Sequence, residues 1–228
     1  MLYALEHPAA FAVLLVSFVV GITLHGCAQA WVARWRGDRR AAQEGRLKAD
    51  PRVQVDPFGA VGALIGGLGW TRPVEVHQVR RKDALIAVTL VGPAVNLVLG
   101  VGLLVLWRAV GTPDLLAAEL HGGAAYVLQH GFPFAGAGDV LLLVGCSQLY
   151  LGALSLVPLP PLDGGRLLFG LAPRTQGWRK AEHHLVERNI GVAVLLALLL
   201  VPLGGPVPVL PNVLDSVLGP LLRLLVGL

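Results

Sequence analysis

Long apolar runs constrain the fold of this chain more than any other feature. A helix must supply about 20 predominantly apolar residues to cross a bilayer, and runs approaching that length recur along the sequence. Four of them are clear: residues 8–33, 84–107, 140–162 and 190–203. Only 14% of the 228 residues are charged, whereas a soluble domain carries about a quarter. We therefore predict an all-α, polytopic membrane helix bundle with little β-structure.

Two further apolar stretches complete a single membrane domain over residues 1–228. Residues 57–70 are short and rich in glycine, and residues 207–228 are interrupted by Asp215, Pro220 and Arg223. Basic residues flank the 57–70 stretch on both sides, so this segment is predicted to be re-entrant, entering the membrane and returning to the same side. The bundle is thus expected to contain about four to six membrane segments. A short β-hairpin near residues 52–76 is the one place where strands are expected.

Basic residues are distributed asymmetrically among the connecting loops. The long connection 108–139 contains Arg108 alone, and the other basic residues concentrate in three loops: 34–52, 72–82 and 166–188. The positive-inside rule then places the N-terminus outside and the basic loops in the cytoplasm. The net charge of +4 is therefore explained by basic loops that set the membrane topology. Nucleic acid is not expected as a partner. The expected surroundings are a lipid bilayer, in a prokaryotic plasma membrane to judge from the compact chain.

The first basic loop, residues 34–51, is too short for a soluble domain. Its charge predicts that it is solvated or lies on anionic headgroups.

Polar side chains inside the apolar runs form a short list of candidate site residues, because such groups are costly in lipid. His25 and Gln29 are four residues apart, so they share one face of a helix. Asp163 follows a proline-rich stretch at the end of the third run. In the predicted topology His25 and Asp163 lie at similar depth near the cytoplasmic side and are placed to meet. The alternative is structural: His25 and Gln29 join helices, and Asp163 pairs with Arg166 at the interface.

Five short motifs occur in order along roughly residues 9–175. They are Leu24-His25 with its helix exit at Gly37-Asp38, Val55-Asp56-Pro57-Phe58-Gly59, Gly69-Trp70-Thr71-Arg72-Pro73-Val74, Gly92-Pro93-Ala94-Val95-Asn96 and Leu159-Pro160-Pro161-Leu162-Asp163-Gly164. Each motif is weak alone. The ordered series resembles the site-2 protease family of intramembrane zinc metalloproteases, the M50 type.

The resemblance implies roles for four positions. In the family, two histidines on one helix and the aspartate of a Leu-Asp-Gly motif bind zinc, and the glutamate after the first histidine is the general base. His25 then matches the first ligand and Asp163 the third. Gln29 stands at the position of the second histidine, and Gly26 at the position of the base. Gln54 also departs, because related proteins often carry a histidine there.

These substitutions predict a degenerate site. A catalytic zinc ion normally has three protein ligands and an open position for water, and His25 with Asp163 supplies only two. Glycine cannot accept a proton, so no catalytic residue and no firmly bound cofactor are expected, with zinc as the metal if any binds. We expect a proteolytically inactive protein that binds or regulates a membrane partner, such as a transmembrane helix of another protein. The alternatives are a zinc-dependent intramembrane metalloprotease with altered ligation and a membrane transport role.

Overall fold

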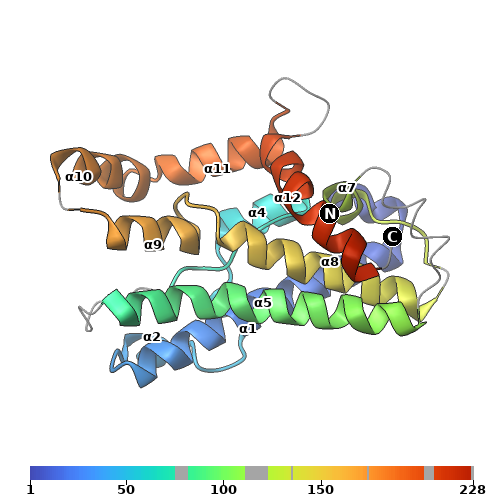
Figure 1. Ribbon diagram of the computed structural model, residues 1–228, viewed down its shortest axis with the longest axis horizontal. Helices are drawn as coiled ribbons and strands as arrows, with labels where there is room; N and C mark the ends of the chain where they lie inside the picture. Colours follow the sequence, from blue (N-terminus) through green and yellow to red (C-terminus); the bar gives the residue numbers. More distant parts are fainter. Residues whose placement is uncertain (75–81, 111–122, 135, 174, 203–207, 227–228) are drawn as a thin grey trace.

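The computed structural model is a helix bundle in which three long helices lie side by side along the long axis (Figure 1). It describes the chain except for residues 75–81, 111–122, 135, 174, 203–207 and 227–228. The long helices are α1 (Pro8–Trp35), α5 (Lys82–Val110) and α8 (Ala137–Ser155). Helix α5 runs in the opposite direction to α1 and α8 (Figure 1).

Shorter helices surround these three. They are η1 (Leu2–Glu6), α2 (Arg40–Gln43), α3 (Pro51–Gln54), α4 (Pro57–Gly66), α7 (Ala124–His130), α9 (Asp163–Leu171), α10 (Gln176–Glu182), η3 (His183–Glu187), α11 (Ile190–Leu200) and α12 (Val209–Val226). Local sequence sets two of the starts. The side chains of Asp50 and Asp56 accept hydrogen bonds from the first-turn amides of α3 and α4, and a proline follows each cap.

Helices α5 and α8 pack with their backbones in contact, because glycines line the interface. A Cβ atom at Gly100 of α5 would lie 2.6 Å from the backbone nitrogen of Leu149. On α8, a Cβ atom at Gly152 would lie 3.0 Å from the carbonyl oxygen of Pro93. Small residues at helix contacts are typical of membrane bundles, where dispersion contacts replace the hydrophobic effect as the cause of helix association.

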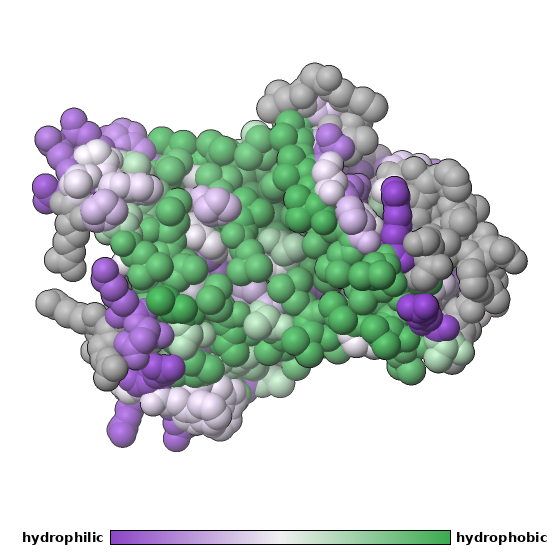
Figure 2. All heavy atoms as spheres, in the orientation of Figure 1, coloured by the Kyte–Doolittle hydropathy of each residue, from purple (hydrophilic) through white to green (hydrophobic). Residues whose placement is uncertain are grey.

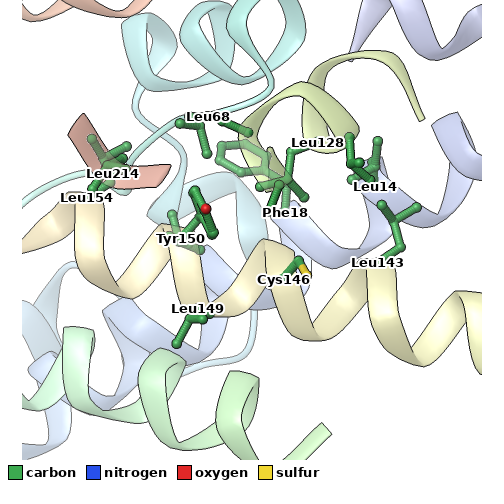
Figure 3. Close-up of a cluster of buried hydrophobic side chains, with 14 of the residues drawn as sticks. Leu14, Phe18, Leu68, Leu128, Leu143, Cys146, Leu149, Tyr150, Leu154 and Leu214 are labelled. Atoms are coloured by element: carbon green, nitrogen blue, oxygen red, sulfur yellow. The ribbon is translucent and has the colours of Figure 1, made fainter. Parts of the chain in front are cut away.

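The main hydrophobic core lies between α1, α8 and the short helices that cover them (Figure 3). Cys146 and Tyr150 of α8 are fully buried within it, and Phe18 of α1 is 6% exposed. Leucine side chains from several elements complete the cluster: Leu14, Leu68, Leu128, Leu143, Leu149, Leu154 and Leu214.

The outer surface is also apolar, as expected for a chain surrounded by lipid. Figure 2 shows a broad hydrophobic surface across the middle of the face in view, with hydrophilic residues gathered toward the ends of the long axis. Val98 on α5 is 73% exposed and Leu224 on α12 is 71% exposed. Among the described residues, four helices are long and apolar enough to cross a membrane: Pro8–Trp35, Lys82–Ala109, Ala137–Ser155 and Val209–Val226. The predicted all-α membrane bundle is confirmed, whereas the side faced by each end stays a prediction.

The 57–70 stretch folds back toward the point where it began. Helix α4 covers only ten residues and ends at Gly67, which adopts a left-handed conformation with φ of 76°. Val55 before the helix then forms an antiparallel bridge with Thr71 after it. This bridge is the only β-pairing in the described residues, so the expected hairpin near residues 52–76 is reduced to one residue pair. That the returning segment lies at membrane depth stays a prediction.

The two C-terminal apolar runs form different kinds of helix. Helix α11 has eleven residues, which cover about 16 Å and fall short of a bilayer. It meets the preceding Gln176–Glu187 helix at a bend of 68°, so the pair has the shape of a broken span or a re-entrant loop. Helix α12 reaches the length of a span despite its charged residues. Its Asp215 accepts hydrogen bonds from the amide of Ala125 and the hydroxyl of Tyr150.

We expect Gly100→Ala to destabilise the bundle by about 1–3 kcal/mol, because the added methyl group meets the backbone of α8 and cannot be accommodated by a rotamer change. Thermal unfolding in detergent measures the effect. Gly102→Ala is the control on the same helix, since a Cβ atom there has no neighbour within 4 Å. Equal losses of stability in the two variants would contradict this packing.

Candidate functional site

The site is assembled from three elements that meet beside the C-terminal half of α1. Helix α1 contributes His25 and Gln29, which share one face and are both fully buried. Asp163 is the first residue of α9 and is 4% exposed. Helix α5 contributes Asn96, which is fully buried.

Two glycines fix the position of Asp163. The chain turns sharply between α8 and α9 over a proline-rich stretch, and α9 begins against that turn. A Cβ atom at Gly164 would lie 2.1 Å from the carbonyl oxygen of Leu156, and one at Gly165 would lie 2.4 Å from the carbonyl carbon of Leu159. Only glycine permits this close approach, which points the first residue of α9 toward α1.

The Asp163 carboxylate accepts hydrogen bonds from both residues of α1. The Nε2 atom of Gln29 donates to Oδ1 over 2.8 Å. The Nε2 atom of His25 lies 2.7 Å from Oδ2. On the other side of the ring, Nδ2 of Asn96 lies 3.1 Å from Nδ1 of His25. With the amide nitrogen of Asn96 facing the ring, this arrangement corresponds to a ring that accepts at Nδ1 and carries its proton on Nε2, toward Asp163.

Helix α5 makes room for the imidazole at Gly92. A Cβ atom at this residue would lie 2.3 Å from Cδ2 and Nε2 of His25. Asn96 lies one helical turn further along the same helix, so its amide reaches the ring from the same face. Gly92 and Asn96 are therefore four residues apart because both contact the ring of His25.

Asp163 is stabilised in its ionised form. Burial by itself raises the pKa of Asp163, but the hydrogen bond from His25, the charge of Arg166 and the hydrogen bond from Gln29 together lower it below the usual value. The Nη1 atom of Arg166 lies 3.4 Å from Oδ1. A carboxyl group with a lowered pKa stabilises the fold above its unfolded pKa of about 3.9, and this contribution is lost as the pH falls through the folded value.

Gly26, the position of the expected base, lies against Gln54 and not against open space. A Cβ atom at Gly26 would lie 2.0 Å from Oε1 of Gln54, which is itself fully buried. The carboxamide of Gln54 is held by Arg46, whose Nε and Nη2 atoms both donate to Oε1.

Arg46 is an exception within the 34–51 loop. The loop was expected to be solvated or to lie on headgroups, and its other basic side chains are exposed, but Arg46 is only 2% exposed. The guanidinium is buried because the carbonyl oxygens of Arg72 and Pro73, together with Gln54, supply acceptors for it. No sequence pattern marks this arginine among its basic neighbours.

Comparison with known proteins finds relatives over most of the chain. It is 34% identical over 214 residues to "Putative zinc metalloprotease YwhC" of Bacillus subtilis, an alignment that covers 90% of this chain and 89% of that protein. The chain belongs to the site-2 protease-like family. It is also 31% identical to "Putative zinc metalloprotease Rip2" of Mycolicibacterium smegmatis and of Mycobacterium tuberculosis, over 75% of this chain and 62% of each relative. No family model matches the chain, and no solved structure matches it.

The family therefore raises the question of zinc, and the described residues do not fit it. They contain no group of three or more histidine, cysteine, aspartate or glutamate side chains that could hold a metal ion. At the site, Gln29 points its N–H group at the carboxylate where a ligand would point a lone pair. His25 and Asp163 alone then supply two of the three protein ligands that a catalytic zinc ion normally has.

Sequence reasoning found most of these residues. His25, Gln29 and Asp163, selected from widely separated motifs, are brought together, and Gly26 lies on the same helix one residue from His25. Their assignment as degenerate ligand and base positions stays a prediction. Among the other histidines, His183 and His184 are exposed on η3, and His77 and His121 lie outside the described residues.

We expect Asp163→Asn to lower the free energy of unfolding by about 3 kcal/mol, because the variant presents an amide N–H group to donors that now bond a carboxylate. Thermal unfolding in detergent at neutral pH measures the loss. The control is Asp83→Asn, which affects a half-exposed pair with Arg36 and should cost less than about 1 kcal/mol. Similar losses in the two variants would show that Asp163 does not join the helices.

Proposed function

We propose that this chain is a non-proteolytic member of the site-2 protease-like family, which binds or regulates a membrane partner without cutting it. The observation that carries the proposal is the closed hydrogen-bonding pattern at Asp163. Both carboxylate oxygens accept N–H groups from α1, one from His25 and one from Gln29. Atoms that would serve as metal ligands are thus bonded to one another.

The missing chemistry also supports the proposal. A catalytic zinc ion lowers the pKa of a bound water molecule and so generates the nucleophile, and this requires a firmly held ion with an open coordination position. Gln29 is a neutral amide and a poor substitute for imidazole. Gly26 has no group that takes a proton, and loss of a general base alone costs about 10²- to 10⁴-fold in rate. The two departures lie within one turn of α1 and affect the same step.

A cleft beside the site supplies a place for a partner. It has a volume of about 570 Å³ and is bounded by the start of α4, by α9 and by the bent helix pair around Asn189. Apolar side chains form much of its lining: Phe58, Leu85, Phe169, Leu185, Val186 and Val192. Arg166 reaches both this cleft and Asp163. We propose that a transmembrane segment of another membrane protein, or the residues flanking it, binds here and is released intact.

One alternative is a working metalloprotease with altered ligation. The names of the relatives favour it, since each is called a zinc metalloprotease. It requires a third ligand from outside the His25–Asp163–Gln29 group and a base other than residue 26.

Transport is less well supported. Polar groups of α1 and α8 bond one another between the helices: the hydroxyl of Ser17 donates to that of Ser147, and Nε2 of Gln148 donates to Ser17. Such contacts join helices, so these polar groups have a structural role without transport.

The proposal predicts less than about 0.1 zinc ion per chain after purification in detergent without chelators, since two ligands hold zinc weakly. It also predicts no chelator-sensitive cleavage of transmembrane substrates. Elemental analysis by mass spectrometry gives the metal content, and electrophoresis of reconstituted reactions gives cleavage.

Gln29→His is the matched comparison, because it restores an imidazole at the position of the missing ligand. We expect this variant to bind more zinc than the natural chain. Near-stoichiometric zinc in the natural chain, lost in His25→Ala and Asp163→Ala and accompanied by cleavage, would overturn the proposal.

A further inference from the structure

The space beside Gly26 is already filled by another part of the chain. A Cβ atom at residue 26 would lie 2.0 Å from Oε1 and 2.7 Å from Cδ of Gln54. Separations this short do not occur between non-bonded carbon and oxygen atoms, so the approach of α1 to Gln54 requires glycine. The first atom of any longer side chain at residue 26 would have to occupy the volume of the Gln54 carboxamide.

Gln54 is fixed in this position from several directions. Its Oε1 accepts from Nε and Nη2 of Arg46 over 3.1 and 2.9 Å, and its Nε2 donates to the carbonyl oxygen of Arg46 over 2.9 Å. Its own carbonyl oxygen accepts from the amide of Arg72 over 2.8 Å and from the hydroxyl of Thr71 over 2.9 Å. Moving the carboxamide aside would break these bonds within a buried region, which is costly.

Arg46 is fixed as firmly as the glutamine it holds. Its Nη1 donates to the carbonyl oxygen of Pro73 over 2.7 Å, and its Nη2 donates to that of Arg72 over 2.6 Å. Burial, together with the nearby charge of Arg72, lowers the pKa of Arg46 to about 10, so the guanidinium stays charged at neutral pH. The pair therefore ties the 40–54 loop to the 71–73 segment, and Nε2 of Gln54 also lies 3.7 Å from Sγ of Cys27 on α1.

We propose that Gln54, clamped by Arg46, is an intramolecular plug that occupies the place of the base side chain and keeps the site closed. Gly26 and Gln54 form a matched pair, in which the glycine is required by the plug and the plug excludes any side chain at residue 26. This inference rests on the proposed loss of proteolysis and names the contact that maintains it. A glutamate introduced at residue 26 alone would collide with Gln54 before it could act as a base.

A cycle of thermal unfolding measurements tests the pair. The four proteins are the natural chain, Gly26→Ala, Gln54→Ala and the double variant, each purified in detergent. In the natural background Gly26→Ala should lower the Tm by on the order of 5 °C or prevent folding, because the methyl group meets the carboxamide. In the Gln54→Ala background the same substitution should cost no more than about 1 °C, since the volume is free and alanine favours helix.

Two controls isolate the contact. Gly21→Ala lies on the same helix, but its Cβ atom would meet Gln148 and Leu151, so its effect should be equal in both backgrounds. Gln54→Glu keeps the volume and the contact with Arg46, so Gly26→Ala should stay costly beside it. If Gly26→Ala fails to fold, recovery of a monodisperse species in the Gly26→Ala, Gln54→Ala double variant supports the pair.

The plug is overturned if Gly26→Ala is harmless in the natural chain, or if its cost is the same with and without Gln54. That outcome leaves the metal analysis of the natural chain unaffected, so the loss of proteolysis would stand on its own evidence. Conversely, stoichiometric zinc and cleavage in the natural chain would overturn the proposed function even if the two positions are coupled.

Discussion

The carboxylate of Asp163 is the group on which the arrangement of this protein depends. It joins α9 to α1 through His25 and Gln29, and His25 in turn joins α1 to α5 through Asn96. A charged group enclosed by apolar helices is tolerated only where partners meet it, so these contacts are obligatory. The same contacts have a chemical consequence. Each N–H group that stabilises the carboxylate occupies a lone pair that a metal ion would need.

Glycines make this arrangement sterically possible. Gly92 lets the His25 ring lie against α5, Gly26 lets α1 approach Gln54, and Gly164 lets α9 begin against the preceding turn. In each case a Cβ atom would lie within 2.3 Å of its neighbour, which leaves no room for adjustment. The space around His25 is therefore bounded by the backbone of α5 at Gly92, and the space beside Gly26 is filled by Gln54.

The sequence predicted the fold class and the central contact because both depend on strong, regular signals. Apolar runs of bilayer length identify membrane helices, and the four-residue spacing of His25 and Gln29 places them on one helical face. The alternation of basic and neutral loops then placed Asp163 at the depth of His25, and the two are in contact. Which side of the membrane His25 and Asp163 lie near stays a prediction.

No such pattern predicts the contact of Gln54 with Gly26 and Arg46. Arg46 lies in a loop rich in basic residues, where a charged side chain is usually solvated, and only the tertiary fold supplies the carbonyl oxygens that bury it. Gln54 stood out as a departure from the family, but its contact with Gly26 joins residues 28 positions apart through a segment without periodicity. The start of α11 at Ile190 coincides with the start of the predicted run 190–203, whereas the bend before it depends on the left-handed conformation of Asn189 and was not predicted.

The protonation state of the His25 ring shows whether its Nε2 atom bonds Asp163 or a metal ion. Nitrogen-15 NMR of histidine-labelled protein, with a His25→Gln variant to assign the signal among the seven histidines, reports which ring nitrogen carries the proton. We expect a neutral ring protonated at Nε2 and unprotonated at Nδ1, unchanged when chelator is added. A metal-bound Nε2 whose signal reverts on chelation would contradict it.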